Sequence, residues 1–356
     1  MPRLYAKTAS NYTNMETKRI STLAGLLLTG MTLLAQPNTE RTFRTPMVHD
    51  PVMAQENDTF YLFSTGHGIQ QMTSADLENW KWHRGGMLTE IPAWTRDSVP
   101  GFKSHIWAPD VIRWHNRWWM MYSCSTFGKN TSAIGLLSSP SLANPEWKDL
   151  GCVVTSHGKE NTAVHAYTNY NAIDPNIIID ENDQPWLSFG SFWDGIQLVQ
   201  LDSTMHIAPE CQPQTIARRY GEKRTDLVNP TSKFAGTNAI EAPFIFRHNG
   251  WYYLFVSWDY CCRGEKSSYN VVVGRSRNVQ GPYLDREGRD MAKGGGTLVI
   301  EGDKKVFEAA GHCSVYNLQK EDKTLFLCHG YSIEHGGQSI LVKRFIDWTD
   351  GWPRLE

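Results

Sequence analysis

One pattern occurs five times along the chain: a short apolar strand, a turn, and a return strand rich in aromatic residues. The copies begin at Asp50, Trp107, Asp174, Glu241 and His312, so successive copies start 57, 67, 67 and 71 residues apart. Repeats with a period of tens of residues are typical of solenoids and propellers. Turn signals such as ENDT, DENDQ and RHNG separate the paired runs, as hairpins require.

A second hairpin follows the first pair in several copies, with strand patterns such as SAIGLLSS and NVVVGRS. This gives roughly four strands per copy, and four-stranded sheets arranged radially are the blades of a propeller. The chain has no long helical periodicity. We therefore predict an all-β fold, a five-bladed β-propeller, with longer insertions between the copies at residues 84–105, 155–171, 205–239 and 284–311.

The first 35 residues differ from the rest of the chain. Two basic residues precede the apolar run ISTLAGLLLTGMTLLA. This layout is typical of a secretory signal peptide, and the run is shorter than the roughly 20 residues of a membrane span. We predict a signal peptide at residues 1–35, with Met15 as an alternative start, and a single catalytic propeller domain at residues 36–356. The expected location is secreted or periplasmic, without membrane insertion after export.

Composition narrows the classes of partner. The formal net charge of the 356 residues is −2 and no basic stripe is present, which argues against nucleic-acid binding. The 14 tryptophans can pack a sheet core or stack on sugar rings. For most of the tryptophans we expect a place in the core. We expect no organic cofactor and a monomer.

Cysteine spacing excludes a structural zinc site. The seven cysteines lie at positions 124, 152, 211, 261, 262, 313 and 328. They include no C-x-x-C pair and no zinc-like spacing. A disulfide between the adjacent Cys261 and Cys262 is not expected, because disulfides favour alpha carbons about 4.4 to 6.8 Å apart.

The residues that open the five copies carry the candidate chemistry. The first strand of each propeller blade runs along the central channel, so these residues are expected to meet at one mouth. A single Asp-Pro is commonly a turn, but three acids at matching places favour a site. Glycoside hydrolysis needs one carboxylic acid to protonate the leaving oxygen and one carboxylate to activate water or attack carbon. A third carboxylate raises the pKa of the proton donor by charge repulsion. These residues alone leave the roles of acid and base open.

Six ordered segments carry a family resemblance: HDPVM, WAPDV, NAIDPN, GSFWDGI, IEAPFIF and WDYCCRG. Together they resemble glycoside hydrolase family 43, and most closely its arabinan endo-1,5-α-L-arabinosidase members, over nearly the whole chain after the signal peptide. The resemblance implies inverting cleavage of internal α-1,5-L-arabinofuranosidic bonds in arabinan. It implies Asp50 as general base, Glu241 as general acid and Asp174 as the carboxylate that tunes and orients the acid. Inversion requires the base and acid carboxyls to lie about 6.5 to 9.5 Å apart.

The resemblance also implies sugar-binding residues and a metal ligand. The expected substrate-binding set is Asp50, Trp107, Gly128, Asn171, Ala172, Ile173, Asp174, Ser191, Phe192 and Trp193. Strand alternation predicts that only one of Phe192 and Trp193 faces the sugar. Relatives hold a metal near a histidine on the axis, which implies a calcium ion at His312 with water completing its shell.

Other functions stay open from the sequence. The same scaffold suits an exo-acting α-L-arabinofuranosidase or a β-xylosidase, depending on whether the insertions leave a groove open or close it into a pocket. A carbohydrate-binding propeller without turnover is a further alternative, although a lectin needs no proton donor with a tuned pKa. A retaining fructan-cleaving propeller is expected to show Asn-Asp-Pro-Asn where this chain has His-Asp-Pro-Val.

Overall fold

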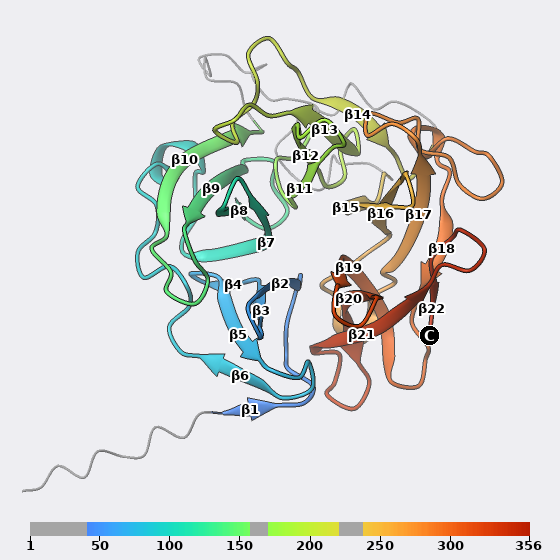
Figure 1. Ribbon diagram of the computed structural model, residues 1–356, viewed down its shortest axis with the longest axis horizontal. Helices are drawn as coiled ribbons and strands as arrows, with labels where there is room; N and C mark the ends of the chain where they lie inside the picture. The colour runs from blue at the N-terminus through green and yellow to red at the C-terminus, as the bar shows by residue number, and fades with distance from the viewer. Residues whose placement is uncertain (1–40, 157–169, 221–237) are drawn as a thin grey trace, which may run out of the picture. The chain divides into compact units, whose positions relative to one another are not determined.

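Five antiparallel sheets surround a common axis in the computed structural model, which describes residues 41–156, 170–220 and 238–356 (Figure 1). The predicted signal peptide lies outside the described residues. Each inner strand contacts the inner strand of the next blade, and the last contacts the first, so the ring is closed. The prediction of an all-β, five-bladed propeller is confirmed.

The blades follow one another in chain order. From the axis outward, blade 1 contains β2 (Val52–Glu56), β3 (Thr59–Ser64), β5 (Gln70–Ser74), β6 (Trp80–His83) and β1 (Thr42–Phe43). Blade 2 contains β7 (His105–Trp114), β8 (Arg117–Cys124), β9 (Ala133–Ser139) and β10 (Lys148–Thr155) in the same direction, with the short β4 (Gly66–His67) paired to the start of β7. Blade 3 contains β11 (Asn176–Ile179), β12 (Pro185–Phe189), β13 (Ile196–Gln200) and β14 (Gln214–Ala217).

The last two blades are built in the same way. Blade 4 contains β15 (Ile240–His248), β16 (Trp251–Trp258), β17 (Asn270–Ser276) and β18 (Thr297–Ile300). Blade 5 contains β19 (Phe307–Leu318), β20 (Lys323–Ser332), β21 (Ser339–Asp347) and β22 (Arg354–Leu355). The helical segments among the described residues are α1 (Thr95–Ser98) and 3₁₀ turns at Gly264–Lys266 and Met291–Lys293. None of the described helices has the length and apolar character needed to span a membrane.

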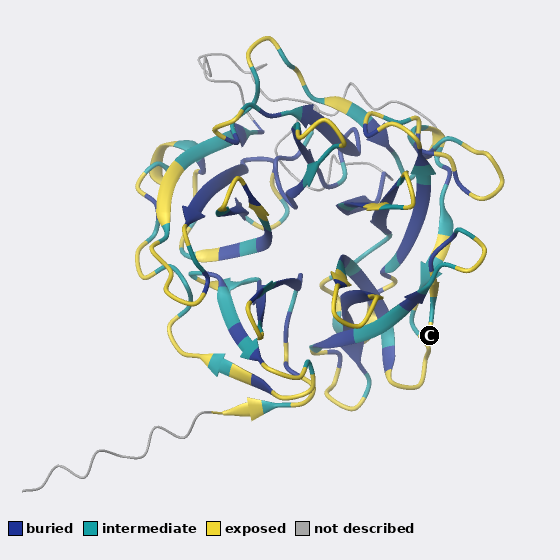
Figure 2. Ribbon diagram, viewed as in Figure 1, coloured by how far each residue is buried: buried dark blue, intermediate teal, exposed yellow. Residues whose placement is uncertain are grey.

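Two of the predicted insertions contain outer strands, so their assignment as connections between copies is corrected. Strand β14 falls inside 205–239 and β18 inside 284–311. Both are edge strands of four residues, too short to show a clear alternation of apolar and polar side chains. Figure 2 shows the inner strands largely buried, while outer strands such as β10 carry many exposed residues.

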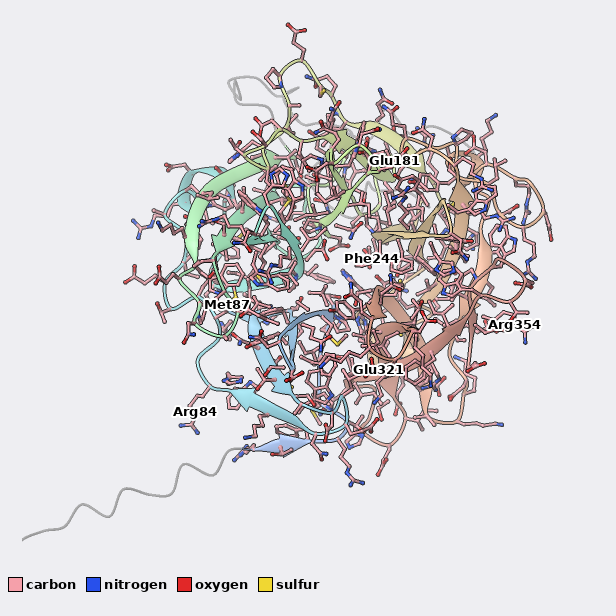
Figure 3. All side chains as sticks on the ribbon, in the orientation of Figure 1. Arg84, Met87, Glu181, Phe244, Glu321 and Arg354 are labelled. Atoms are coloured by element: carbon pink, nitrogen blue, oxygen red, sulfur yellow. The ribbon has the colours of Figure 1, made fainter. Side chains whose placement is uncertain are left out.

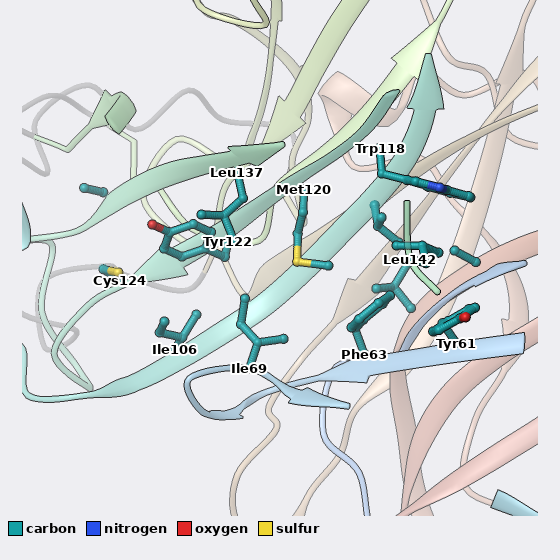
Figure 4. Packing of buried hydrophobic residues seen from close by; sticks show 14 of the residues in the cluster. Tyr61, Phe63, Ile69, Ile106, Trp118, Met120, Tyr122, Cys124, Leu137 and Leu142 are labelled. Atoms are coloured by element: carbon teal, nitrogen blue, oxygen red, sulfur yellow. The ribbon is translucent and has the colours of Figure 1, made fainter. Parts of the chain in front are cut away.

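Apolar side chains fill the spaces between blades. Between blades 1 and 2, Phe63 and Ile69 pack with Ile106, Met120 and Leu137, all almost fully buried (Figure 4). Strands rich in aromatic and branched residues pack well on pleated surfaces, which explains why this sequence forms sheets packed face to face. Charged side chains such as Arg84 and Arg354 lie at the periphery, whereas Phe244 lies near the axis (Figure 3).

The segment between β1 and β2 of blade 1 pairs with the last blade. The Val48 N–H donates to the carbonyl of Ser339 at 3.2 Å, and the Leu341 N–H donates to the carbonyl of Pro46 at 2.9 Å. These bonds attach residues 46–48 to β21 of blade 5. The ring is therefore sealed by backbone hydrogen bonds between its first and last parts.

A buried carboxylate joins blades 1 and 2. Glu56 accepts hydrogen bonds from Trp118 Nε1 at 2.8 Å, Ser141 Oγ at 2.6 Å, Leu142 N–H at 2.9 Å and Ala143 N–H at 2.7 Å. Burial acts to raise the pKa of Glu56, but these hydrogen bonds outweigh it and lower the pKa below its ordinary value. The charged form of Glu56 therefore stabilises the fold.

We expect Glu56→Ala to lower the free energy of unfolding by about 2 to 4 kcal/mol, because four donors lose their acceptor. Chemical denaturation at neutral pH measures this change. Because the pKa of Glu56 is lower in the folded state, its contribution is present at neutral pH and is lost as the pH falls through that lowered value. The difference between wild type and variant is thus expected to shrink in acid. Asp58→Ala, which removes an exposed ion pair with Lys320, is the matched control and is expected to change stability little.

Candidate active site

The five blades share a backbone irregularity next to the axis. One residue in each blade takes a positive φ, either within the inner strand or two residues before it: Asp50 (55°), Ala108 (44°), Asp174 (57°), Ala242 (54°) and His312 (52°). The strand registers shift beside this residue in β7, β15 and β19, as in β-bulges. Bulges often lie next to active sites, where they redirect a side chain.

This irregularity corrects the alignment of the five copies. Trp107 and Glu241 lie one residue before the positive-φ position, whereas Asp50, Asp174 and His312 occupy it. The five copies were aligned in the sequence by their functional residues. In blades 2 and 4 the functional side chain comes from the residue just before the positive-φ position. All five side chains nevertheless line one cavity.

A cavity of about 1090 Å³ collects almost all the predicted site residues. It is lined by Asp50, Trp107, Gly128, Asn171, Ile173, Asp174, Ser191, Phe192, Trp193, Glu241 and His312, together with residues that the sequence did not single out. Residues separated by up to 262 positions thus lie around one cavity.

Ala172 is the exception among the predicted substrate-binding residues. Its side chain is fully buried in the apolar cluster shared by blades 2 and 3, and its N–H donates to Ser156 Oγ at 2.8 Å. The prediction that it lines the sugar site is wrong for its side chain. Its neighbours Asn171 and Ile173 line the cavity, so the chain exposes every second residue at this point.

Phe192 and Trp193 lie in a turn that follows the bridge at Ser191. Both have positive φ, 56° and 40°, so the alternation expected of a strand does not apply. Both are among the residues around the cavity, but Trp193 is only 2% exposed whereas Phe192 is partly exposed, so that only one of them faces the sugar stays a prediction. Phe192 also packs against Tyr260 across the cavity wall, with ring centroids 5.8 Å apart.

Asp50 is held by side chains from blades 1 and 5 and from the segment before β2. Thr65 Oγ1 donates to its Oδ2 at 2.5 Å, while Nδ1 of His49 and Nδ1 of His312 lie 2.8 and 3.0 Å from its Oδ1. Burial acts to raise the pKa of Asp50, but the charges of the two histidines outweigh it and hold the pKa well below its ordinary value. The carboxyl is therefore ionised.

His329 supports the same residue as a neutral ring. The Asp50 N–H donates to His329 Nδ1 at 3.1 Å, which requires that nitrogen to be unprotonated. Burial, with the nearby charge of His49, holds the pKa of His329 well below its ordinary value. In blades 2, 3 and 5 the N–H of the positive-φ residue donates to a hydroxyl oxygen instead of a histidine. The acceptors are Thr65, Ser123 and Ser257, in that order.

Glu241 has the opposite electrostatic character. Burial raises its pKa, although hydroxyl groups of Tyr269 and Ser191 act to lower it. The Ser191 hydroxyl donates to Glu241 Oε2 at 2.8 Å. The sequence predicted repulsion between carboxylates as the cause of a raised pKa, whereas burial is its largest cause in the structure.

Asp174 lies beside Glu241 and is buried. Its Oδ2 accepts the N–H of Ala242 at 3.2 Å, so it contacts the peptide directly after Glu241. Burial raises the pKa of Asp174 well above its ordinary value, and the charge of Glu241 adds to this rise. The cavity therefore combines one ionised carboxylate with two carboxyls whose pKa values are raised.

Comparison with known proteins decides the family. The sequence pattern of the family described as glycosyl hydrolases family 43 matches residues 43–353. The chain belongs to this family. It is a glycoside hydrolase, and the family assignment made from its motifs is confirmed.

Individual family 43 relatives cover most of the chain. An extracellular exo-α-(1→5)-L-arabinofuranosidase, ArbA, of Cellvibrio japonicus is 42% identical over 87% of this chain and 86% of its own. An extracellular endo-α-(1→5)-L-arabinanase of Bacillus subtilis is 36% identical over 86% of this chain and 87% of its own. The crystal structure of an exo-1,5-α-L-arabinanase from a bovine ruminal metagenomic library superposes with a TM-score of 0.78 at 48% identity, covering 88% of this chain and 98% of that one.

Several residues of this family 43 cavity were not predicted from the sequence. They include His49, Thr65, His105, Phe127, Tyr260 and Arg263. His49 had a signal, because it directly precedes Asp50 in the HDPVM segment. Thr65 and Phe127 follow ordinary strand patterns, and only the closed ring shows that these residues face the axis.

The histidines near Asp50 bear on the expected metal. His49, Asp50 and His329 place one possible ligand atom each within 4.8 Å of one another, but two of these are nitrogens and calcium prefers oxygen. His312 fits better, because its Nδ1 bonds a carboxylate, as in many metal-binding histidines. Its other ring nitrogen would bind an ion only when the ring is neutral. Because Asp50 raises the pKa of His312 against the effect of burial, a proton and an ion would compete for that nitrogen, and either charge favours the ionised form of Asp50.

We expect Ser191→Ala to shift the alkaline limb of the pH profile of kcat/KM upward by about one unit. The Ser191 hydroxyl bonds the charged form of Glu241, so its loss raises the pKa of the acid. A general acid must be protonated, and activity is lost as the pH rises through its pKa, so a higher pKa extends activity to higher pH. Ser191→Thr keeps a hydroxyl and is the control, expected to retain the wild-type limb. An unchanged limb in Ser191→Ala would count against Glu241 as the titrating acid.

Proposed function

We propose that this family 43 protein hydrolyses α-1,5-linked L-arabinan with inversion of the anomeric centre. The main support for this proposal is a pair of carboxyls in one cavity whose pKa values are shifted in opposite directions. The pKa of Asp50 is lowered and that of Glu241 is raised. Two carboxyls whose environments move their pKa values apart are suited to base and acid roles. The names of the relatives support arabinan as the substrate.

In this mechanism Glu241 donates its proton to the oxygen of the leaving sugar as the glycosidic bond breaks. Asp50 accepts a proton from a water molecule, whose oxygen attacks the anomeric carbon from the opposite face. The products are a sugar with inverted configuration and a sugar with a free hydroxyl. Asp50 ends protonated and Glu241 ionised, and exchange with solvent restores both. The separation of their carboxyls needed for the water, about 6.5 to 9.5 Å, stays a prediction.

Asp174 acts as a positioning residue. By accepting the N–H of Ala242, it fixes the peptide next to Glu241 and so the direction of the acid. Trp107 and Phe192, which are partly exposed, supply flat apolar faces for sugar rings, and the buried Trp193 lies in the cavity wall. Gly128 has a φ of 75° and carries no side chain, which suits close approach of a substrate to the backbone.

Two modes of attack on the chain are candidates. Cleavage of internal bonds follows from the motif resemblance and agrees with the name of the Bacillus subtilis relative. Release from a chain end is the second candidate, favoured by the higher identity to proteins named exo-acting. Both modes use the same three carboxyls.

The time course of products from linear 1,5-arabinan tests the function. We expect mixed oligosaccharides early in the reaction for internal cleavage, and one short product throughout for release from the end. NMR is expected to show the first-formed anomer with inverted configuration. Glu241→Ala is expected to lose about 100-fold or more in kcat, as on removal of a general acid.

Glu287→Ala, a change at an exposed glutamate far along the chain from the site residues, is the control and is expected to keep wild-type turnover. Rapid release of xylose from aryl xylosides without attack on arabinan would contradict the substrate. Full activity of Glu241→Ala would contradict the assignment of the acid.

We also propose that His312 binds a calcium ion with water completing its shell. Such an ion supplies fixed positive charge in the channel, which favours the ionised form of nearby carboxylates. After chelation, added calcium is expected to raise the melting temperature of wild type, since a ligand that binds only the folded state stabilises it. His312→Ala is expected to lose that rise. Equal melting curves of wild type with and without calcium would refute the proposal.

We also propose that residues 1–35 are a signal peptide that directs export of the protein. The names of two relatives, both called extracellular, support it. Expression of the full sequence is expected to give a product that begins after residue 35 in the periplasmic or culture fraction.

A further inference from the structure

Two adjacent cysteines form part of the cavity wall and have no role in the mechanism above. Cys261 and Cys262 follow β16 and both line the cavity. Their sulfur atoms lie 2.7 Å apart, and the Cys262 residue is exposed. Two thiols in contact and open to solvent can exchange with a disulfide and form one between themselves, which a single buried thiol cannot do.

The surroundings of the pair distinguish its two sulfurs. The hydrogen bond from Cys261 lowers the pKa of Cys262 to about 5, with a smaller contribution from His49. The same contact raises the pKa of Cys261 well above its ordinary value. Cys262 therefore carries the thiolate, which is the nucleophilic form, and Cys261 keeps the proton.

The remaining five cysteines offer a contrast. Cys124, Cys313 and Cys328 are buried, and burial raises the pKa of each thiol. Cys211 and Cys152 are half-buried. The sulfur of Cys211 contacts the amide oxygen of Gln200 at 3.9 Å, and the sulfur of Cys152 contacts the carbonyl of Val154 at 3.6 Å. The contact between thiols next to the cavity is thus a particular feature of positions 261 and 262.

We propose that Cys261 and Cys262 are a reversible redox site, which low-molecular-weight disulfides convert to an intramolecular disulfide in the cavity wall. The Cys262 thiolate attacks one sulfur of the small disulfide, forming a mixed disulfide and releasing one thiolate. Cys261 then loses its proton and attacks the Cys262 sulfur, which releases the second thiol. The small disulfide gains two electrons and becomes two thiols, while the protein pair loses two electrons.

The strain that argues against a lasting disulfide between these neighbours also makes the proposed disulfide reversible. Disulfides favour alpha carbons farther apart than neighbouring residues allow, and strained or exposed disulfides are reduced readily. The structure with both thiols free and in contact represents the reduced form. Thiols in excess are therefore expected to restore it.

Closure of the disulfide also affects the catalytic base. The Cys262 N–H donates to the Tyr331 hydroxyl at 2.7 Å, and that hydroxyl lies 3.1 Å from His49 Nε2. His49 in turn contacts Asp50 at 2.8 Å. Linking the two sulfurs requires the peptide between them to rotate, which moves the N–H that holds Tyr331. We therefore expect the oxidised protein to hydrolyse its substrate more slowly.

Mass spectrometry of the whole protein treated with oxidised glutathione tests the covalent step. Trypsin releases residues 248–263 as one peptide, HNGWYYLFVSWDYCCR, which contains both cysteines and no other. We expect its mass to fall by about 2 Da through loss of two hydrogens, and dithiothreitol to reverse the change. A peptide that keeps two free thiols, or that retains bound glutathione, would overturn the proposal.

Two variants sharpen the result. Cys262→Ser is expected to lose the 2 Da change, whereas the matched Cys211→Ser is expected to keep it. Cys261→Ser is expected to stop at the mixed disulfide with glutathione on position 262. The peptide can lose 2 Da only when both thiols are present. The same loss in Cys261→Ser or Cys262→Ser would therefore refute a disulfide between these two cysteines.

The effect on hydrolysis rests on the proposed function. Oxidation of wild type is expected to lower kcat/KM on arabinan about threefold or more, since small displacements near reacting groups are costly. Dithiothreitol is expected to restore the rate. Cys262→Ser cannot form the disulfide, so its kcat/KM is expected not to fall on treatment with oxidised glutathione. Equal rates before and after complete oxidation would overturn the link to Asp50. If arabinan is not cleaved at all, the mass measurement still tests the redox site separately.

Discussion

The chemistry of this propeller depends on one left-handed residue in each blade beside the axis, within the inner strand or just before it. The N–H of that residue turns away from the ladder and donates to a side chain of the preceding blade. Asp50, Asp174 and His312 occupy this position, and Glu241 directly precedes it. A regular ladder would direct these side chains alternately into the two faces of each sheet. The left-handed residue instead lets carboxyls from three blades share one cavity.

Burial within that cavity has opposite outcomes for two carboxyls because their partners differ. Asp50 lies against two histidine nitrogens and a threonine hydroxyl, and these outweigh the cost of burying its charge. The partners of Glu241 are hydroxyl groups, which only partly offset the effect of burial on its pKa. The pKa of Glu241 therefore rises. The opposite pKa shifts of the two carboxyls thus originate in their neighbours. Asp50 has His49, His312 and Thr65, whereas Glu241 has the hydroxyls of Ser191 and Tyr269.

Much of the fold and the centre of the site could be predicted from the sequence. The repeat of hairpins predicts five blades, and the residues that open the copies predict the cavity. The sequence could not show that blades 2 and 4 are offset by one residue, because a bulge depends on pairing between strands. It also misplaced Ala172, whose neighbours face the cavity, and gave Phe192 and Trp193 a strand geometry where the chain turns. Thr65 and Phe127 had no local signal, since their role follows from closure of the ring.

The seal of the ring and Asp50 are adjacent in the chain. Residues 46–48 pair with β21, and Asp50 follows only two residues later, held by His312 and His329 of the blade that receives the seal. Local separation of this seam would displace Asp50 while the five sheets stay folded. We therefore expect activity to be lost on heating when this seam opens, before the cooperative melting of the sheets. Substitutions that tighten the seam would lengthen the working life of the enzyme more than added packing within a blade.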